Sequence, residues 1–245
     1  MALEICTISA KSFRRGDFRR GFLRHQAALH VRGAVSEKQA TTWAKAVLEA
    51  EEHWLREFKG QMYTLGRAWY AHVESGKAKA YKQGALASNQ LVDSVVPGLS
   101  SAMRSCLTQA LKRKVVQRKN WCGAGVHVFT PKQNSAGAIH YDVEGDEEAE
   151  ESADVPLASG VLMLQPPERG GELRLWGRLY DPKDGRQSLG RAPNVDYVEV
   201  KYEPGDFVVF NSYRLHQIRA HRGNKARVSA TLHAIRRGGR WESWF

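Results

Sequence analysis

From about Val126 onward the chain consists of short β-rich runs separated by turn residues, and this pattern restricts the fold more than any other feature. Pairs such as Pro166-Pro167, Gly170-Gly171 and Gly223-Asn224 mark the turns. Eight successive short strands without crossover helices are typical of an antiparallel jelly roll, or double-stranded β-helix. The predicted strands are Val126–Thr130, Ala138–Val143, Ala158–Gln165, Gly171–Trp176, Val195–Tyr202, Asp206–Phe210, Arg214–Ala220 and Ala226–Ile235.

The first part of the chain is richer in helical patterns. Ser36 is suited to cap a helix that we expect to run to about Phe58, and a second helix is expected from about Pro97 to Lys114. A short strand is predicted at Gln26–Val31, while Tyr63–Val73 is ambiguous between strand and helix. We therefore predict an α+β fold with a cupin-like double-stranded β-helix core and an N-terminal helical layer. The chain is expected to form one domain over 1–245, with the helix-rich layer at 1–120 and the jelly-roll core at 121–237.

The net charge of +11 would suit a nucleic-acid binder or an enzyme for anionic substrates. The basic residues are spread widely, however, so a generally basic surface is the favoured interpretation. The acidic segment Glu144–Asp154 is expected to be a solvated surface loop. We also expect no membrane span and no signal peptide. Three widely spaced cysteines suggest no disulfide framework, and a cytoplasmic location is the natural expectation.

Two histidines and one aspartate form a candidate metal site. His140 and Asp142 are two residues apart, so on a strand both side chains point to the same face. His216 would complete the set from a later strand. Two imidazoles and one carboxylate on one side of an ion are typical of non-haem Fe(II) oxygenases. His-x-Asp alone is weak evidence, and His72-Val-Glu74 is a rival that lies outside the strand-rich region.

The downstream residues strengthen this interpretation. If Gly223-Asn224 forms the tip of a hairpin, His216 lies across from Thr231, and Arg227 and Ser229 share its face. Arg227 then lies four residues along from the row of His216, roughly 13 Å at the usual strand rise. A five-carbon diacid that chelates the metal at one end would place its other carboxylate near Arg227 and Ser229.

His140-x-Asp142, His216 and Arg227-x-Ser229 together resemble the motif of the Fe(II)/2-oxoglutarate-dependent dioxygenase superfamily. This resemblance covers about Val126 to Ile235, with a looser similarity upstream to the aliphatic halogenases of indole alkaloid pathways. Those halogenases carry Gly where this chain has Asp142, which favours hydroxylation or desaturation here. The resemblance implies an enzyme that uses Fe(II), O2 and 2-oxoglutarate, with His140, Asp142 and His216 as metal ligands. It also implies that Arg227 and Ser229 bind 2-oxoglutarate, which is decarboxylated to succinate.

Other residues have weaker indications. Trp121, Trp176 and His233 are candidates for lining a substrate pocket, although core packing is the safer default for the two tryptophans. The hairpin parity places His233 inward and His221 outward, so His221 is expected at the surface.

The leading function is oxidation of an unactivated C–H bond in a small molecule, in specialised metabolism, and an anionic substrate would suit the charge. The alternatives are an oxygenase acting on a nucleic acid, nucleotide or protein, and a non-catalytic jelly-roll binding protein. His233 stands where nucleic-acid demethylases of the superfamily carry a second arginine, which counts against a nucleic-acid substrate.

Overall fold

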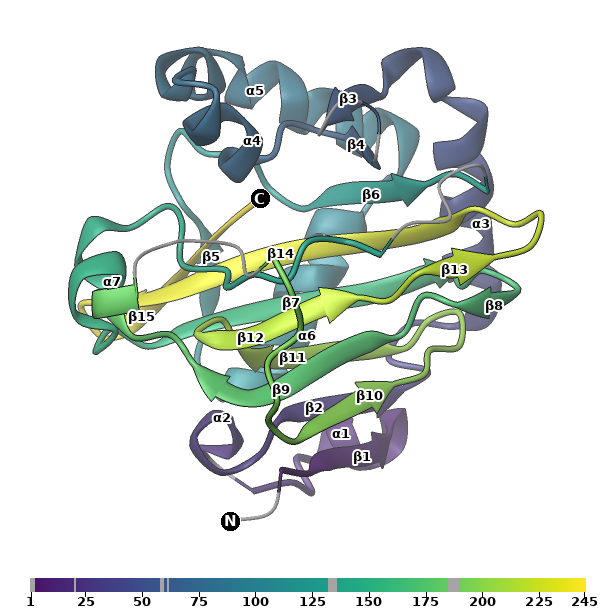
Figure 1. The fold of residues 1–245 in the computed structure, drawn as a ribbon. Helices are drawn as coiled ribbons and strands as arrows, with labels where there is room; N and C mark the ends of the chain where they lie inside the picture. The colour runs from purple at the N-terminus through teal and green to yellow at the C-terminus, as the bar shows by residue number, and fades with distance from the viewer. Residues whose placement is uncertain (1–2, 20, 58–59, 61, 132–135, 185–189) are drawn as a thin grey trace.

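Two facing sheets form the centre of the molecule in this computed structural model, which describes residues 3–19, 21–57, 60, 62–131, 136–184 and 190–245. The larger sheet has the order β1-β2-β11-β7-β14-β6-β4-β3, and β15 extends it by pairing with both β14 and β5 (Figure 1). Its strands are β1 Ile5–Ser9, β2 Ala28–Arg32, β3 Leu55–Glu57, β4 Met62–Leu65, β5 Val115–Gln117, β6 Gly125–Phe129, β7 Leu157–Gln165, β11 Phe207–Asn211, β14 Arg227–Arg237 and β15 Arg240–Trp244.

The smaller sheet has the order β10-β9-β12 and lies across the larger one. Its strands are β9 Leu173–Leu179, β10 Tyr197–Val200 and β12 Arg214–Ile218, and a separate pair joins β8 Arg169–Gly170 to β13 His221–Arg222. The extended segment 138–142 runs along β12 and pairs with it through an isolated bridge between His140 and His216. It is therefore less regular than the strand predicted at Ala138–Val143.

The chain alternates between the two sheets in the manner of a double-stranded β-helix. In chain order the successive positions are β6, the segment 138–142, β7, β9, β10, β11, β12 and β14. Of these, β6, β14, β7 and β11 are neighbours in the larger sheet, while 138–142, β12, β9 and β10 are neighbours in the smaller one. The predicted fold class is confirmed, and every predicted strand of the core corresponds to one of these positions.

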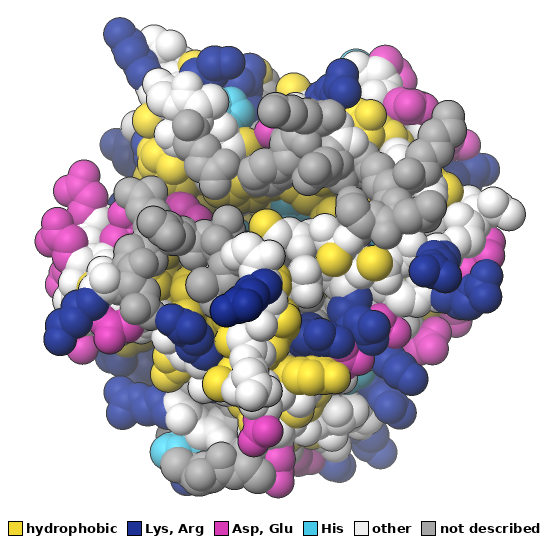
Figure 2. Space-filling view, viewed as in Figure 1, with side chains coloured by type: hydrophobic (Ala, Val, Ile, Leu, Met, Phe, Trp, Pro, Cys, Tyr) yellow, Lys and Arg dark blue, Asp and Glu magenta, His cyan; other side chains and the backbone are white. Residues whose placement is uncertain are grey.

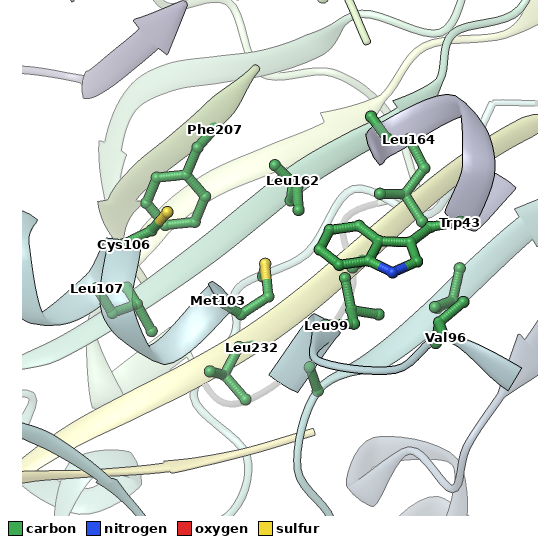
Figure 3. Packing of buried hydrophobic residues seen from close by; sticks show 14 of the residues in the cluster. Trp43, Val96, Leu99, Met103, Cys106, Leu107, Leu162, Leu164, Phe207 and Leu232 are labelled. Carbon is green, nitrogen blue, oxygen red and sulfur yellow. The ribbon is translucent and has the colours of Figure 1, made fainter. Parts of the chain in front are cut away.

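Helices cover the outer face of the larger sheet. Alternate residues of β7 and β14, such as Leu162 and Leu232, pack there against Trp43 of α3 and Met103 and Leu107 of α6 (Figure 3). Because these residues are fully or almost fully buried, this layer forms the principal core. The helices are α1 Ala10–Arg15, α2 Phe22–His25, α3 Glu37–Glu49, α4 Trp69–Glu74, α5 Ala78–Val95, α6 Leu99–Leu111 and α7 Glu147–Ser152, with short 3-10 turns at η1 Glu51–His53 and η3 Pro182–Asp184.

Several local predictions need correction. Ser36 caps α3 by accepting a hydrogen bond from Gln39 N, but the helix ends at Glu49 instead of Phe58, because residues 55–57 form an edge strand. The ambiguous segment divides into β4 and α4. The acidic segment predicted as a loop contains α7, which begins with Asp146 as its cap and has acidic residues in its first turn, where they favour a helix.

The surface view agrees with the expectation of scattered charge. Figure 2 shows Lys and Arg side chains distributed over this face among Asp and Glu, without one dominant basic stripe. Among the residues that the structure describes, no helix has both the length and the apolar character needed to cross a bilayer.

Candidate metal centre

The segment 138–142 and β12 bring the two candidate histidines side by side. The backbone N–H of each histidine donates to the carbonyl of the other, both at 3.0 Å, and their ring centroids lie 4.2 Å apart. Asp142 N donates to Ser212 O, which holds the aspartate next to the start of β12. The three side chains thus converge from residues far apart in the sequence.

His140, Asp142 and His216 place their potential ligand atoms within 4.8 Å of one another. His140 Nε2 lies 3.4 Å from Asp142 Oδ1, and His216 Nε2 lies 3.4 Å from Asp142 Oδ2. His216 is buried, whereas His140 remains partly exposed. Three donors gathered on one side, with an open side beyond His140, suit an ion that also binds small molecules.

Hydrogen bonds fix which ring nitrogen of each histidine faces this point. His140 Nδ1 lies 2.9 Å from Ala138 O, and His216 Nδ1 lies 2.9 Å from Arg214 O. A carbonyl oxygen can only accept, so both Nδ1 atoms carry hydrogen and both Nε2 atoms are left as donors to a metal. This donor set fits Fe(II), which binds imidazole and carboxylate ligands.

The charges of the site reinforce one another. Burial opposes ionisation, but the hydrogen bond and charge of Asp142 raise the pKa of His140 to about 9. Burial likewise opposes ionisation of Asp142, yet the nearby histidines hold its pKa well below its usual range. The carboxylate is therefore ionised, and a metal ion bound at Nε2 would take the place of the proton on His140.

Arg227 is a fully buried cation at the start of β14. Its Nε donates to Gly171 O at 3.0 Å and its Nη1 donates to Ser229 Oγ at 2.7 Å. Nη2 is buried and has no hydrogen-bond partner among the described residues. Since an uncompensated buried charge is costly, this geometry fits the binding of a carboxylate from a ligand.

Tyr202 is a residue that sequence reasoning missed. Its ring centroid lies 5.7 Å from the Arg227 guanidinium carbon, and its buried hydroxyl also has no partner among the described residues. Tyr202 follows β10, and nothing in its local sequence indicates that the chain returns to Arg227 at this point. Together Arg227, Ser229 and Tyr202 offer three donors to one carboxylate.

The predicted hairpin between β12 and β14 is wrong. β12 pairs with β9 in the smaller sheet, whereas β14 pairs with β6 and β7 in the larger one. Arg227 and Ser229 nevertheless face the interior between the sheets, because β14 alternates. The intervening residues Val228 and Ala230 belong to the core under the helices.

His221 is likewise not at the surface. It is buried, and its Nε2 lies 3.2 Å from Thr130 O. Burial and the nearby charge of Arg227 lower its pKa, so it is neutral.

A small pocket adjoins the metal-binding residues. It is lined by Trp69 and Tyr70 of α4, Trp244 and Phe245 at the end of the chain, and Asp142, Glu144 and His233. Trp69 N donates to Phe245 O at 3.1 Å, which ties two of the lining segments together. The pocket wall is thus largely aromatic, and Figure 2 shows a furrow with hydrophobic and histidine side chains at the centre of this face.

Of the three predicted substrate residues, only His233 lines this pocket. Trp121 lies behind the wall, with its ring centroid 4.5 Å from that of Trp69 and 5.8 Å from that of Trp244. Trp176 is buried in the same hydrophobic cluster as Trp121 and Trp244, but it lies on the side of the smaller sheet opposite to His216, which pairs with Leu175. A substrate role for either tryptophan stays a prediction that these positions do not support.

Comparison with known proteins gives structural matches alone. No family model matches the sequence, and no curated protein matches it significantly. Among solved structures, the non-heme alpha ketoglutarate dependent epimerase SnoN from nogalamycin biosynthesis matches with 16% identity and a TM-score of 0.60, over 94% of this chain and 87% of that chain. An N-substituted L-amino acid dioxygenase from Burkholderia ambifaria matches with 15% identity and a TM-score of 0.56, over 96% and 91%.

A prolyl hydroxylase from Trichoplax adhaerens, in complex with a peptide fragment, matches with 11% identity and a TM-score of 0.56, over 92% of this chain and 90% of that chain. At such low identities these similarities establish the fold and not the substrate. The chain therefore has the fold of the Fe(II)/2-oxoglutarate-dependent dioxygenase superfamily.

Proposed function

We propose that this protein is a non-haem Fe(II)/2-oxoglutarate-dependent oxygenase that hydroxylates or desaturates an unactivated C–H bond of a small molecule, in specialised metabolism. The observation that carries the proposal is the convergence of His140, Asp142 and His216 inside a β container whose interior also holds Arg227, one guanidinium nitrogen of which has no partner in the described part of the chain. A non-catalytic binding protein has no evident use for both features.

Each group has a separate task. His140 and His216 would hold iron through Nε2, and Asp142 would supply the single negative charge. Arg227, Ser229 and Tyr202 would bind the far carboxylate of 2-oxoglutarate and so fix its orientation. When bound, iron with 2-oxoglutarate and O2 supplies the oxidising power for C–H cleavage, while 2-oxoglutarate is converted to succinate and CO2.

The aromatic residues beside the candidate metal ligands favour a small-molecule substrate. Trp69, Tyr70, Trp244 and Phe245 line the same small pocket as Asp142, so an apolar group bound against them would lie next to the metal ligands. Aromatic side chains bind apolar molecules strongly and exclude water from the reacting centre. Two of the structural neighbours, SnoN and SnoK, are named for the biosynthesis of the small molecule nogalamycin.

The proposal is tested by adding Fe(II) and 2-oxoglutarate to the protein without oxygen. We expect a weak charge-transfer absorption band in the visible range, which His140→Ala and Asp142→Ala should each abolish. His53→Ala, which alters an exposed histidine away from the site, is the matched control. Bound iron without a band would contradict the role of 2-oxoglutarate. Succinate release measured across a panel of metabolites would then identify the substrate class.

A further inference from the structure

A buried serine connects the candidate metal centre to the larger sheet. Ser159 is the third residue of β7, in the run Leu-Ala-Ser-Gly-Val-Leu-Met-Leu, and is completely buried. A hydroxyl buried in such an apolar strand must find hydrogen-bond partners inside the protein. Its partners are Asp142, Ser212 and His233.

The three contacts can be assigned by counting hydrogens. Ser159 Oγ lies 2.6 Å from Asp142 Oδ2, 2.8 Å from Ser212 Oγ and 3.1 Å from His233 Nδ1. The ionised carboxylate can only accept, so the single hydroxyl hydrogen of Ser159 is donated to Asp142. Ser212 O–H and His233 Nδ1–H must then both donate to Ser159. All hydrogen-bonding positions of the serine oxygen are thus used, and its direction is fixed by Ser212, just after β11, and by His233 of β14.

This arrangement orients the carboxylate of Asp142. Oδ2 accepts the short hydrogen bond from Ser159 and lies 3.7 Å from His233 Nδ1 and 3.4 Å from His216 Nε2. Oδ1 lies 3.4 Å from His140 Nε2. With Oδ2 tied to Ser159, the carboxylate is held with one oxygen near each of the two histidine nitrogens.

We propose that Ser159 is the positioning residue of the metal centre: it holds Asp142 through Oδ2 and so keeps the carboxylate turned toward His140 and His216, with Ser212 and His233 fixing the serine in turn. This inference rests on the proposed function. Ser159 touches neither substrate nor metal and acts through the orientation of one carboxylate. Partners of this kind raise metal affinity by about 10–100-fold in other metal sites.

The experiment measures binding of Co(II), a redox-stable substitute for Fe(II), by calorimetry and by its visible absorption. Ser159→Ala should weaken Co(II) binding at least tenfold and change the Co(II) spectrum, because the carboxylate loses the hydrogen bond that orients it. Ser159→Thr keeps the hydroxyl and should restore most of the affinity. Ser243→Ala is the matched control, because Ser243 is equally buried but its hydroxyl donates to Val116 O, far from the triad.

The outcomes separate the two ideas. If the wild-type protein binds neither Co(II) nor Fe(II), the proposed function fails and this inference fails with it. If the wild type binds Co(II) and Ser159→Ala binds it equally well with the same spectrum, only the role of Ser159 is overturned. Should Ser159→Ala not fold, Ser159→Cys keeps the side-chain shape with a much weaker donor, and unchanged binding by that variant would overturn the role equally.

Discussion

Arg227 and Tyr202 are the two residues that we most expect to gain hydrogen bonds when a ligand binds. Both side chains are buried, and Arg227 Nη2 and the Tyr202 hydroxyl have no partner among the described residues. Burial lowers the pKa of Arg227 and raises that of Tyr202. Both directions reflect the cost of burying a charged group at this place.

Replacing Arg227 by Ala should raise the apparent KM for 2-oxoglutarate by about 100-fold, because loss of a charge-assisted pair costs about 3 kcal/mol. Initial rates of succinate formation measure this effect. Arg236→Ala, on the exposed end of the same strand, should leave the KM unchanged. An unaltered KM in Arg227→Ala would show that another residue holds the far carboxylate.

Tyr202→Phe gives a finer test, because it removes only the hydroxyl. We expect the KM for 2-oxoglutarate to rise about threefold to tenfold, in keeping with one lost hydrogen bond of about 1 kcal/mol. The free energy of unfolding of the ligand-free protein should not fall, since the hydroxyl has no hydrogen-bond partner to lose among the described residues. Urea denaturation checks this point, and a clear loss of stability would indicate a structural role for the hydroxyl.

At the level of elements, Asp206 joins β2 to the start of β11. Its Oδ2 accepts from His30 Nε2 at 2.9 Å and from Glu203 N at 3.0 Å, and its Oδ1 accepts from Gly33 N at 2.9 Å. Burial opposes its ionisation, but these hydrogen bonds outweigh burial and lower its pKa. The carboxylate therefore stabilises the edge of the larger sheet in its charged form.

Asp206→Asn should lower the free energy of unfolding at pH 7 by about 2 kcal/mol. Because the folded protein depresses the pKa of Asp206, its contribution is present above the unfolded value of about 4 and is lost as the pH falls through the lower folded value. The difference between wild type and variant should thus shrink below about pH 4. Urea denaturation from pH 7 to pH 3 tests this, with the exposed Asp181→Asn as control.

The elements differ in how far sequence reasoning could place them. The strands of the core were predictable because turn residues such as Gly170-Gly171 and Gly223-Asn224 separate apolar runs. Helix α5 was missed, since its buried stripe consists of Tyr81, Ala85, Ser88 and Val92, two of which are not distinctly apolar. Strand β15 also lies outside the predicted core.

In the candidate site, too, some features could be predicted from the sequence and others could not. Strand alternation predicted that His140 and Asp142 share one face, and the structure places their ligand atoms together. Arg227 also contacts Ser229, and His233 contacts Ser159, although the hairpin from which their inward direction was predicted is not formed. Which sheet each strand joins could not be derived from local pattern, so the pairing of β12 was predicted wrongly. Tyr202 and Ser159 depend on long-range packing, and no local feature identifies them.

At the scale of the whole molecule, the three cysteines are free thiols in different environments. Burial raises the pKa of Cys106 to about 12 and also raises that of Cys122, whereas Cys6 is only half-buried on the edge strand β1. A thiol reagent attacks the thiolate, so buried thiols of high pKa react slowly.

We therefore expect the folded protein to expose at most one reactive thiol to Ellman's reagent, and the protein in guanidinium chloride to show all three. Cys6→Ser should abolish the rapid reaction. Fast modification of a second thiol in that variant would mean that the layer holding α6, or the aromatic cluster near Cys122, opens readily.

Apart from Asp142, none of the residues that line the aromatic pocket is a candidate metal ligand. Trp69 and Tyr70 come from α4, and Trp244 and Phe245 follow from β15. Gly125 leaves space that the ring of Phe245 fills. Under the proposed function, exchange of residues along these two segments would change which molecules bind while the candidate metal ligands stay in place, so these segments are where engineering of selectivity should begin.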